Sequence, residues 1–268
     1  MKGAGGLSRK LLTILAMAVI PLSGIAVAQN ATGPNNVYIE QVGSSNTITI
    51  EQVGGGNNVG GTGGGFTVSS TNVTTLIPTA PSATNYGTIT GNFNVLNLNQ
   101  FGDSNSAQYN IKGNNNLYTS TITGNANQTN LQIGDLTSGN NLRNTVIETI
   151  LGNTNTVMQT VVGSDIASTL DISGNNNQVT NELLSSRGSV TNTIAGDFNV
   201  FKSQQSDSAG ANGHVLVMNT LGDYNSMVTQ QQGFNDTSIN ISTVGSHNTI
   251  TVRTSSSSIA GPLTAIAR

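Results

Sequence analysis

Apolar and polar residues alternate strictly along residues 46–57, which read N-T-I-T-I-E-Q-V-G-G-G-N. Ile48 and Ile50 fall on one side of an extended segment, while the threonines and Glu51 fall on the other. This period of two predicts a half-buried β-strand. Glycines follow at once, and glycine adopts the positive φ angles that a tight reversal needs. The segment therefore predicts one strand followed by one turn.

The same strand-turn unit returns at intervals of eleven residues. Residues 35–45 have the layout of residues 46–56, and from residue 91 onwards glycine and asparagine recur in the same register. The turn glycines are Gly43, Gly54, Gly102, Gly113, Gly124, Gly152, Gly174, Gly222 and Gly245. One such unit is too short to bury a core, so the units must stack. We therefore predict an all-β chain, a β-solenoid of strand-turn-strand coils built from 11-residue half-repeats, with about 22 residues per coil.

The predicted strands are apolar on one face only. The third, fifth and seventh residues of each unit point the same way, because strand side chains alternate. These inward sets are Val37/Ile39/Gln41, Ile48/Ile50/Gln52, Leu96/Leu98/Gln100, Ala107/Tyr109/Ile111, Val157/Gln159/Val161, Ser168/Leu170/Ile172, Val190/Asn192/Ile194, Leu216/Met218/Thr220, Ile239/Ile241/Thr243 and Ile250/Val252/Thr254. One face of every strand should be buried. At about 4.8 Å per coil, roughly seven or eight coils make a column about 35 Å tall.

Amide side chains recur at the seventh position and after the turn. In a stack they lie above their counterparts, so they can hydrogen bond to each other along the stack. The candidate ladder residues are Gln41, Asn46, Gln52, Asn57, Asn94, Gln100, Asn105, Asn116, Asn155, Asn177 and Gln231. Each end of such a column offers a row of unpaired backbone groups. We expect the same ladders to support self-assembly.

Residues 1–28 have the pattern of a secretory signal peptide. Three basic residues precede an apolar run over residues 11–20, which is too short to span a bilayer, and the sequence A-V-A at residues 26–28 is a small-x-small cleavage site. We expect cleavage before Gln29, with a buried N-terminal helix as the alternative. No other stretch is apolar enough to cross a membrane. The expected chain is secreted, as an extracellular or cell-surface protein.

The repeat divides the rest of the chain. The expected segments are a polar linker at residues 29–34, a first solenoid coil at 35–56, a Gly/Pro-rich insertion at 57–85, a main β-solenoid at 86–254 and a C-terminal tail at 255–268. Glycine entropy and missing proline donors oppose a ladder strand in the insertion. We expect a loop there, with a loose strand at residues 71–77, or a hinge between two units. The tail is expected to be poorly ordered.

The composition excludes several classes of function. The chain has no Cys, which rules out disulfides, thiolate metal sites and Cys nucleophiles. Without the leader, six Lys and Arg stand against twelve Asp and Glu, a net charge of −6. The cations are scattered along the chain, so nucleic acid is not an expected partner.

No motif in the chain predicts catalysis. His214 and His247 lie in different units and are expected to be surface turn residues. The carboxylates are singly spaced, so a glycosidase pair would need two of them to meet across coils. Residues 61–65 lack the Lys and the helix of a phosphate loop. Thr-x-Thr triplets raise an ice-binding alternative, although the other outward positions are mixed. We expect no enzyme, no cofactor and no metal site.

Three blocks of the chain share a more specific motif. At residues 41–46, 52–57 and 100–105 the chain reads Gln-x-Gly-x-x-Asn after alternating aliphatic residues, with a weaker echo at residues 231–233. This motif resembles the curlin repeat, which is carried by the subunits of the functional amyloid curli. The likeness covers about residues 35–254 by period. Only those blocks carry the whole motif, because Ile or Val takes the Gln position elsewhere.

The resemblance implies a structural subunit that crosses the outer membrane through a dedicated pore. Such a chain is nucleated at the cell surface by a nucleator subunit and then stacks end to end with itself into fibres of the biofilm matrix, which serve surface adhesion. In that family, Asp in the turns is thought to slow premature polymerisation, and Asp103, Asp165, Asp197 and Asp223 occupy similar positions. They also simply suit turns and solubility. A non-polymerising β-solenoid adhesin on a cell or virion surface is the alternative.

Overall fold

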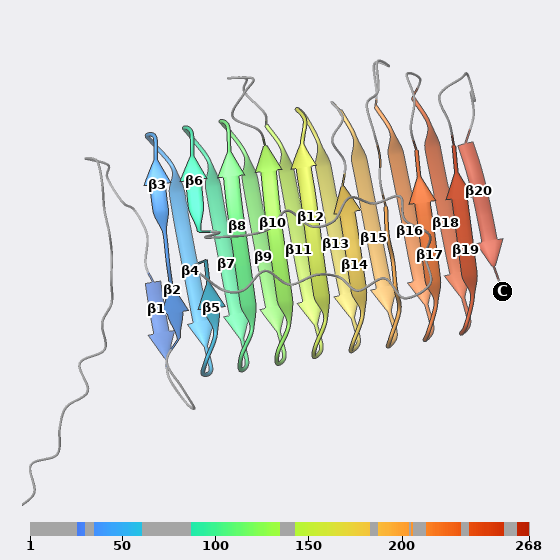
Figure 1. Cartoon of the computed structure of the whole chain (residues 1–268), viewed down its shortest axis with the longest axis horizontal. Helices are drawn as coiled ribbons and strands as arrows, with labels where there is room; N and C mark the ends of the chain where they lie inside the picture. Colours follow the sequence, from blue (N-terminus) through green and yellow to red (C-terminus); the bar gives the residue numbers. More distant parts are fainter. Residues whose placement is uncertain are drawn as a thin grey trace, which may run out of the picture.

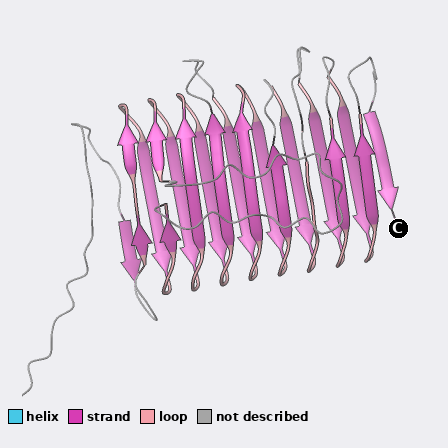
Figure 2. Cartoon of the chain, viewed as in Figure 1, coloured by secondary structure: helices cyan, strands magenta, loops and turns pink. Residues whose placement is uncertain are grey.

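The computed structural model describes residues 26–29, 35–60, 87–134, 143–182, 187–203, 205, 213–231, 236–254 and 262–267. Within these ranges the chain forms strands, turns and short irregular segments and no helix (Figure 2). All the strand pairings are parallel, and the strands lie in stacked sheets. The predicted all-β class is confirmed, and the architecture is compatible with a β-solenoid.

The larger sheet, called sheet A here, runs from β1 at one end of the stack of strands to β20 at the other (Figure 1). Its strands in spatial order are β1 (Ala26–Gln29), β4 (Thr47–Val53), β7 (Val95–Phe101), β9 (Leu117–Thr123), β11 (Thr145–Leu151), β13 (Ala167–Ser173), β15 (Ser189–Ala195), β16 (Val215–Leu221), β18 (Ser238–Val244) and β20 (Pro262–Ala267). Spatial order follows chain order. Each strand therefore pairs with the strands of the preceding and following turns of the chain.

The second sheet, called sheet B here, is built from the alternate strands. These are β2 (Asn36–Val37), β3 (Glu40–Val42), β5 (Asn58–Val59), β6 (Thr88–Thr90), β8 (Ser106–Lys112), β10 (Gln128–Gly134), β12 (Thr156–Val162), β14 (Gln178–Glu182), β17 (Ser226–Gln230) and β19 (Thr249–Arg253). Val200 bridges Gln178 on one side and Ser226 on the other, so residues 200–203 join the two parts of sheet B.

Paired residues are most often 22 positions apart, as for Val95 with Leu117 and Thr145 with Ala167. Larger steps occur where extra residues enter, as for Leu117 with Thr145. From β4 onwards, these extra residues either follow a sheet B strand or, at residues 61–86, interrupt one. The turns from sheet A to sheet B have three residues each. One edge of the stack is thus regular, and the other accommodates the insertions.

The core lies between the two sheets and contains the predicted inward residues. Aliphatic side chains such as Ile48, Leu98, Ile172 and Ile241 are buried in it. Residues near the two ends of the stack are less covered, and Val37, Ile39 and Val252 are half-buried. The alternation read from the sequence therefore identifies the buried face of the strands.

The break in the period is shorter than predicted. Asn58 and Val59 belong to the ladder as β5, and the chain rejoins sheet B at Gly87 and β6. The predicted insertion at residues 57–85 is corrected to 61–86, which lies outside the described residues together with the expected strand at 71–77. Strand β4 pairs with β7 along its whole length, so the segments before and after the break lie in the same sheets rather than on either side of a hinge.

The two ends of the chain also differ from the predictions. Residues 262–267 were expected in a poorly ordered tail, but they form β20, which pairs with β18. Residues 26–29, which span the expected cleavage site, form β1 beside β4. The rest of the leader, the linker at 30–34 and residues 255–261 lie outside the described residues. Periodicity could not find β20, because residues 255–261 separate it from the last regular unit.

One column on the outer face of sheet B is also buried. It contains Gln108, Asn130, Met158 and Thr180, the third residues of their strands. Asn130 Nδ2 donates to Gln108 Oε1 at 3.1 Å along this column. Burial in sheet B is therefore not confined to the inward face.

Candidate assembly ladders

Glycine is required at the first position of the turns by the spacing of the stack. Gly54 has a φ of +110°, and a Cβ built on it would lie 2.0 Å from the carbonyl oxygen of Gly102 in the next turn. The same overlap recurs at Gly102 and Gly124. Any side chain here would collide with backbone that belongs to the ladder. The turn glycines thus allow consecutive turns to lie in direct contact.

The asparagine after each turn from sheet A to sheet B forms a continuous column along the regular edge. Asn127 is typical: its Nδ2 donates to Gly152 O at 2.7 Å, and its Oδ1 accepts the backbone N–H of Asn155 at 2.9 Å. The column contains Asn35, Asn57, Asn105, Asn127, Asn155, Asn177, Asn199, Asn225 and Asn248. Each side chain before the last therefore binds the backbone of the following turn, and this column is the longest ladder among the described residues.

A second, shorter column follows the turns from sheet B to sheet A. Asn94 donates its N–H to Asn46 Oδ1 at 2.8 Å, and Asn116 donates to Asn94 Oδ1 at 3.0 Å. Asn144 Oδ1 accepts from the N–H of Ile166, and there the column ends because Ile166 has no side-chain amide. The predicted ladder asparagines thus divide between two columns on opposite edges.

The middle residue of each regular turn makes a third ladder, which the sequence reasoning missed. Asp103 Oδ1 accepts the N–H of Gly55 at 2.7 Å, and Asp223 Oδ1 accepts the N–H of Asp197 at 2.7 Å. The intervening oxygens come from Asn125, Asn153, Asn175 and Asp197. Turn aspartates therefore have a structural use, as acceptors between turns. The signal in the sequence was an Asp or Asn directly after the turn glycine.

The three glutamines of the curlin-like motif have different surroundings. Gln52 Nε2 donates to Gln100 Oε1 at 2.8 Å, which forms the expected amide pair. Gln41 pairs through its backbone with Ile89, so no glutamine lies beside it in the next strand. Gln231, from the weaker echo of the motif, lies outside the amide ladders, since its Nε2 donates to the backbone oxygen of Val215 at 3.0 Å and its Oε1 accepts from Thr237.

Buried amide atoms without hydrogen-bond partners lie at both ends of the stack. Among the described residues, both polar atoms of the Gln41 side chain, Oε1 of Gln52 and Nδ2 of Asn248 have no partner, and within the stack the same holds for Nδ2 of Asn181, Oδ1 of Asn192 and Oε1 of Gln205. In the preceding turns of its column, the Nδ2 atoms of Asn199 and Asn225 donate to a glycine carbonyl of the next turn. A buried amide left unpaired costs about 1–3 kcal/mol. The ends of the column would therefore gain from a further strand.

A polar cluster interrupts the core at Glu148. Its Oε1 accepts from Ser120 Oγ at 3.0 Å, and its Oε2 accepts from Thr129 Oγ1 at 3.0 Å and from Gln159 Nε2 at 2.9 Å. Ser168 Oγ donates in turn to Gln159 Oε1. Burial raises the pKa of Glu148, and the hydrogen bonds from Gln159, Thr129 and Ser120 offset part of that rise. No pattern in the sequence indicated this carboxyl, because the fourth position of the regular sheet A strands, where Glu148 stands, has an apolar residue in most of them and Ser120 or Asn192 in the others.

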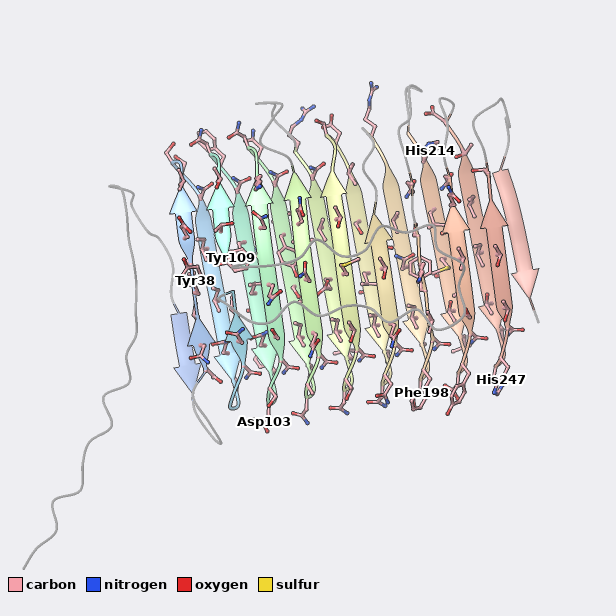
Figure 3. All side chains as sticks on the ribbon, viewed as in Figure 1. Tyr38, Asp103, Tyr109, Phe198, His214 and His247 are labelled. Carbon is pink, nitrogen blue, oxygen red and sulfur yellow. The ribbon has the colours of Figure 1, made fainter. Side chains whose placement is uncertain are left out.

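The histidines occupy two different environments (Figure 3). His214 is buried, with Nδ1 2.7 Å from Thr237 Oγ1, so the prediction that it is a surface residue was wrong. His247 is exposed on a regular turn, and its ring stacks on Tyr224, which stacks on Phe198 at centroid distances of 5.2 and 4.9 Å. These three rings succeed one another at the same turn position, next to the turn-oxygen ladder.

The described ranges contain no group of three or more His, Asp or Glu side chains placed to hold a metal. Within the same ranges, no helix has the length and apolar character needed to cross a membrane. No family model, curated protein or solved structure matches the chain. The candidate site is the set of ladders and the two ends where they stop.

Replacing Asn127 with Ala should destabilise the fold by about 2 kcal/mol, because it leaves the N–H of Asn155 and the carbonyl of Gly152 without partners inside the stack. Asn125→Ala is the matched control in the same turn, since Asn125 is exposed and its side chain accepts one bond, from Asp103 N–H. Its cost should stay near or below about 0.5 kcal/mol. Chemical denaturation of both variants measures the difference, and equal costs would contradict a ladder role for Asn127.

Proposed function

We propose that this chain is a secreted structural protein that assembles end to end with copies of itself into extracellular curli-like amyloid fibres. The repeating element of the proposal is a β-solenoid coil of two 11-residue units. Backbone pairs whose sequence numbers differ by 22 occur in both sheets and support it, as for Leu96 with Tyr118 and Thr156 with Gln178.

The observation that carries the proposal is that the ladders stop while buried donors and acceptors remain open. Gln41 and Gln52 present unpaired amide atoms at the first strands, and Asn248 presents one at the last regular turn. A strand edge also exposes unpaired backbone groups, which are a template for another chain. A second copy offers strands of the same length and pattern, so it is the partner whose ladders fit best.

The localisation and the remaining partners rest on the sequence. The leader pattern at residues 1–28 supports export, and the curlin-like motif supports a biofilm matrix fibre with a role in adhesion. An outer-membrane secretion pore and a nucleator subunit are the further partners that this motif suggests. Neither a cofactor nor catalysis has a part in the proposal.

Seeded growth of fibres tests the proposed function. Chain beginning at Gln29 is diluted from denaturant at neutral pH, and thioflavin fluorescence and electron microscopy are followed with and without preformed fragments. Sigmoidal growth that fragments shorten, together with fibres, is the expected result. A chain that stays monomeric with a folded β spectrum would contradict the proposal.

Replacing Gln52 with Ala should slow fibre growth about tenfold, because it removes the buried amide pair with Gln100 and the open acceptor in β4. Gln41→Ala should act in the same direction through its two unpaired amide atoms. Gln128, exposed on the outer face of β10, gives the matched control Gln128→Ala. Wild-type growth rates in both test variants would exclude the glutamines from assembly.

A monomeric adhesin is the second candidate, favoured by the strands at the ends of sheet A. Strand β1 covers β4, and β20 covers β18, so both edges of the repeat in this sheet are occupied within one chain. A strand that covers an edge in this way hinders the pairing of that edge with another chain. The seeded-growth experiment separates the two candidates, since an adhesin of this kind would fold and remain monomeric.

A further inference from the structure

The strands β1 and β20 occupy equivalent places at opposite ends of sheet A. Residues 26–28, A-V-A, pair with residues 50–52, the fourth to sixth positions of β4. Residues 265–267, A-I-A, pair with residues 241–243, the same positions of β18. Two three-residue segments of nearly identical sequence therefore lie in the same register of the unit, one before the first regular strand and one after the last.

A level is one strand position along the stack. Once β1 is removed, the two sheets end at different levels. The expected cleavage before Gln29 takes away residues 26–28, so sheet A then begins at β4. Sheet B extends one strand further at this end, because β2 pairs with β5, and β5 follows β4 directly in the chain. At the other end, sheet A extends one strand further as β20, beyond the level of β18 and β19. Sheet B therefore projects by one strand at the first end and sheet A projects by one strand at the last, so the two ends fit each other.

The number of strands in each sheet agrees with this arrangement. Among the described residues, sheet A has ten strands, and without β1 it has nine. Sheet B has nine levels, with β2 and β3 sharing one, β5 and β6 sharing another, and residues 200–203 supplying one between β14 and β17. A column of identical copies needs the same number of levels in both sheets. Only the chain without β1 meets that condition.

We infer that, in the fibre, β20 of one copy takes the place of β1 beside β4 of the next copy, while β2 and β3 of that copy pair with β19 of the first. The inference rests on the proposed function and specifies its interface. In the uncleaved chain, the last residues of the leader fill the acceptor edge. Removal of the leader therefore both releases the chain and opens its site for a second copy.

The direction of the backbone hydrogen bonds identifies the donors of this interface. Along the stack, the N–H groups of first and third strand residues, such as Asn36 and Tyr38, point to the following strand. Those of second and fourth residues, such as Phe201 and Ser203, point to the preceding strand. In β20, this alternation directs the N–H of Thr264 and Ile266 away from β18, towards an incoming copy. Pro262 begins the strand without a donor, outside the positions that β1 uses on β4.

Replacing Ile266 with Pro should therefore slow elongation about a hundredfold while the monomer stays folded. Proline removes the outward donor and adds a ring beside the incoming strand, yet it is tolerated on an edge strand whose N–H faces solvent. Ile266→Ala keeps the N–H and is the matched control, with elongation close to wild type. Circular dichroism checks the fold of each monomer. Equal elongation of the Pro and Ala variants would exclude β20 as the donor strand.

Disulfide mapping tests the interface directly, because the chain has no Cys of its own. The proposed register places Thr264 of one copy opposite Thr49 of the next, and Cα atoms on adjacent strands are about 4.8 Å apart, within disulfide reach. Chain from Gln29 carrying Thr49→Cys is mixed with chain carrying Thr264→Cys, assembled and oxidised. Thr193→Cys, on an exposed position of β15, replaces Thr49→Cys in the control mixture.

A covalent dimer in the Thr49 and Thr264 mixture, and none in the control, is the expected result. Chains that begin at Ala26 instead of Gln29 should give a lower yield, since they retain β1. Fibres that form without this dimer would overturn the inference and leave the proposed function intact. No fibres at all would overturn the proposed function, and the interface with it. Equal dimer yields from both starting points would overturn the blocking role of β1.

Discussion

Replacing Gly124 with Ala is expected to destabilise the chain by more than about 4 kcal/mol, enough to prevent the native stack from forming. A Cβ at this position would lie 1.9 Å from the carbonyl oxygen of Gly152, and the φ of +122° is strained for any residue with a side chain. The carbonyl cannot move without separating two turns of the ladder. Circular dichroism and chemical denaturation of the purified variant measure the loss.

Ala126 provides the control, because it lies in the same turn with a φ of 55°, in the left-handed region where glycine is unstrained. Ala126→Gly should change stability by less than about 0.5 kcal/mol. A wild-type free energy of unfolding in Gly124→Ala would contradict the close contact between turns on which the fold depends.

Replacing Glu148 with Gln should raise the free energy of unfolding by about 3 kcal/mol at pH 8, because the unfolded chain holds this carboxyl charged at that pH while burial disfavours the charged form in the folded chain. Burial raises the pKa of Glu148 above its ordinary value of 4.5, so the folded chain binds this proton more tightly than the unfolded chain. The stabilisation of the folded wild-type chain by this tighter proton binding is complete below pH 4.5, and it is lost as the pH rises towards the folded-state pKa of Glu148. The contribution of this carboxyl should therefore make the wild-type chain more stable at pH 4 than at pH 8.

The dependence of the free energy of unfolding on pH distinguishes the effect of the Glu148 carboxyl from a general change in stability. In Glu148→Gln, the part of the profile due to this carboxyl should disappear, and the gain over wild type should be small at pH 4. Glu51→Gln is the matched control, since Glu51 is exposed on the outer face of β4. An unchanged profile in Glu148→Gln would show that the buried carboxyl does not control the stability of the chain.

The local pattern of the sequence was sufficient to predict the regular strands and their inward face. Ile48 and Ile50 are inward because side chains alternate in a strand, and Asn105 and Asn155 lie in a ladder because turns of equal length place them above one another. Both inferences need only the period of the strand and the length of the turn. Which side chains lie beside a given residue depends on the turn of the chain that stacks on it.

Features that depend on a particular neighbour were not predictable from the period. Glu148 is buried because Ser120, Thr129 and Gln159 supply donors from other strands. Gln41 has the motif of a ladder glutamine, yet Ile89 lies beside it because the chain returns to sheet B only at Gly87. His214 is buried with a contact to Thr237, which comes from the following turn. In each case the neighbour is set by an insertion or by a single residue of another unit, and the period alone does not specify it.

The two edges of the stack differ in how completely they link one turn to the next. The regular edge carries the long asparagine column and the turn oxygens, which bind each turn to its neighbour. On the other edge the asparagine column stops at Ile166, close to where extra residues enter the connections. The regular edge is therefore expected to be the one that continues without interruption from copy to copy.

Electron cryomicroscopy of fibres grown from chain beginning at Gln29 tests the proposed end-to-end assembly most directly. Both sheets are expected to continue across each junction at the strand spacing, with β20 beside β4 of the next copy. Nine levels per copy at about 4.8 Å give an axial repeat of about 43 Å per subunit. Fibres in which copies meet through their sides, with the ends of both sheets left unpaired, would contradict end-to-end assembly.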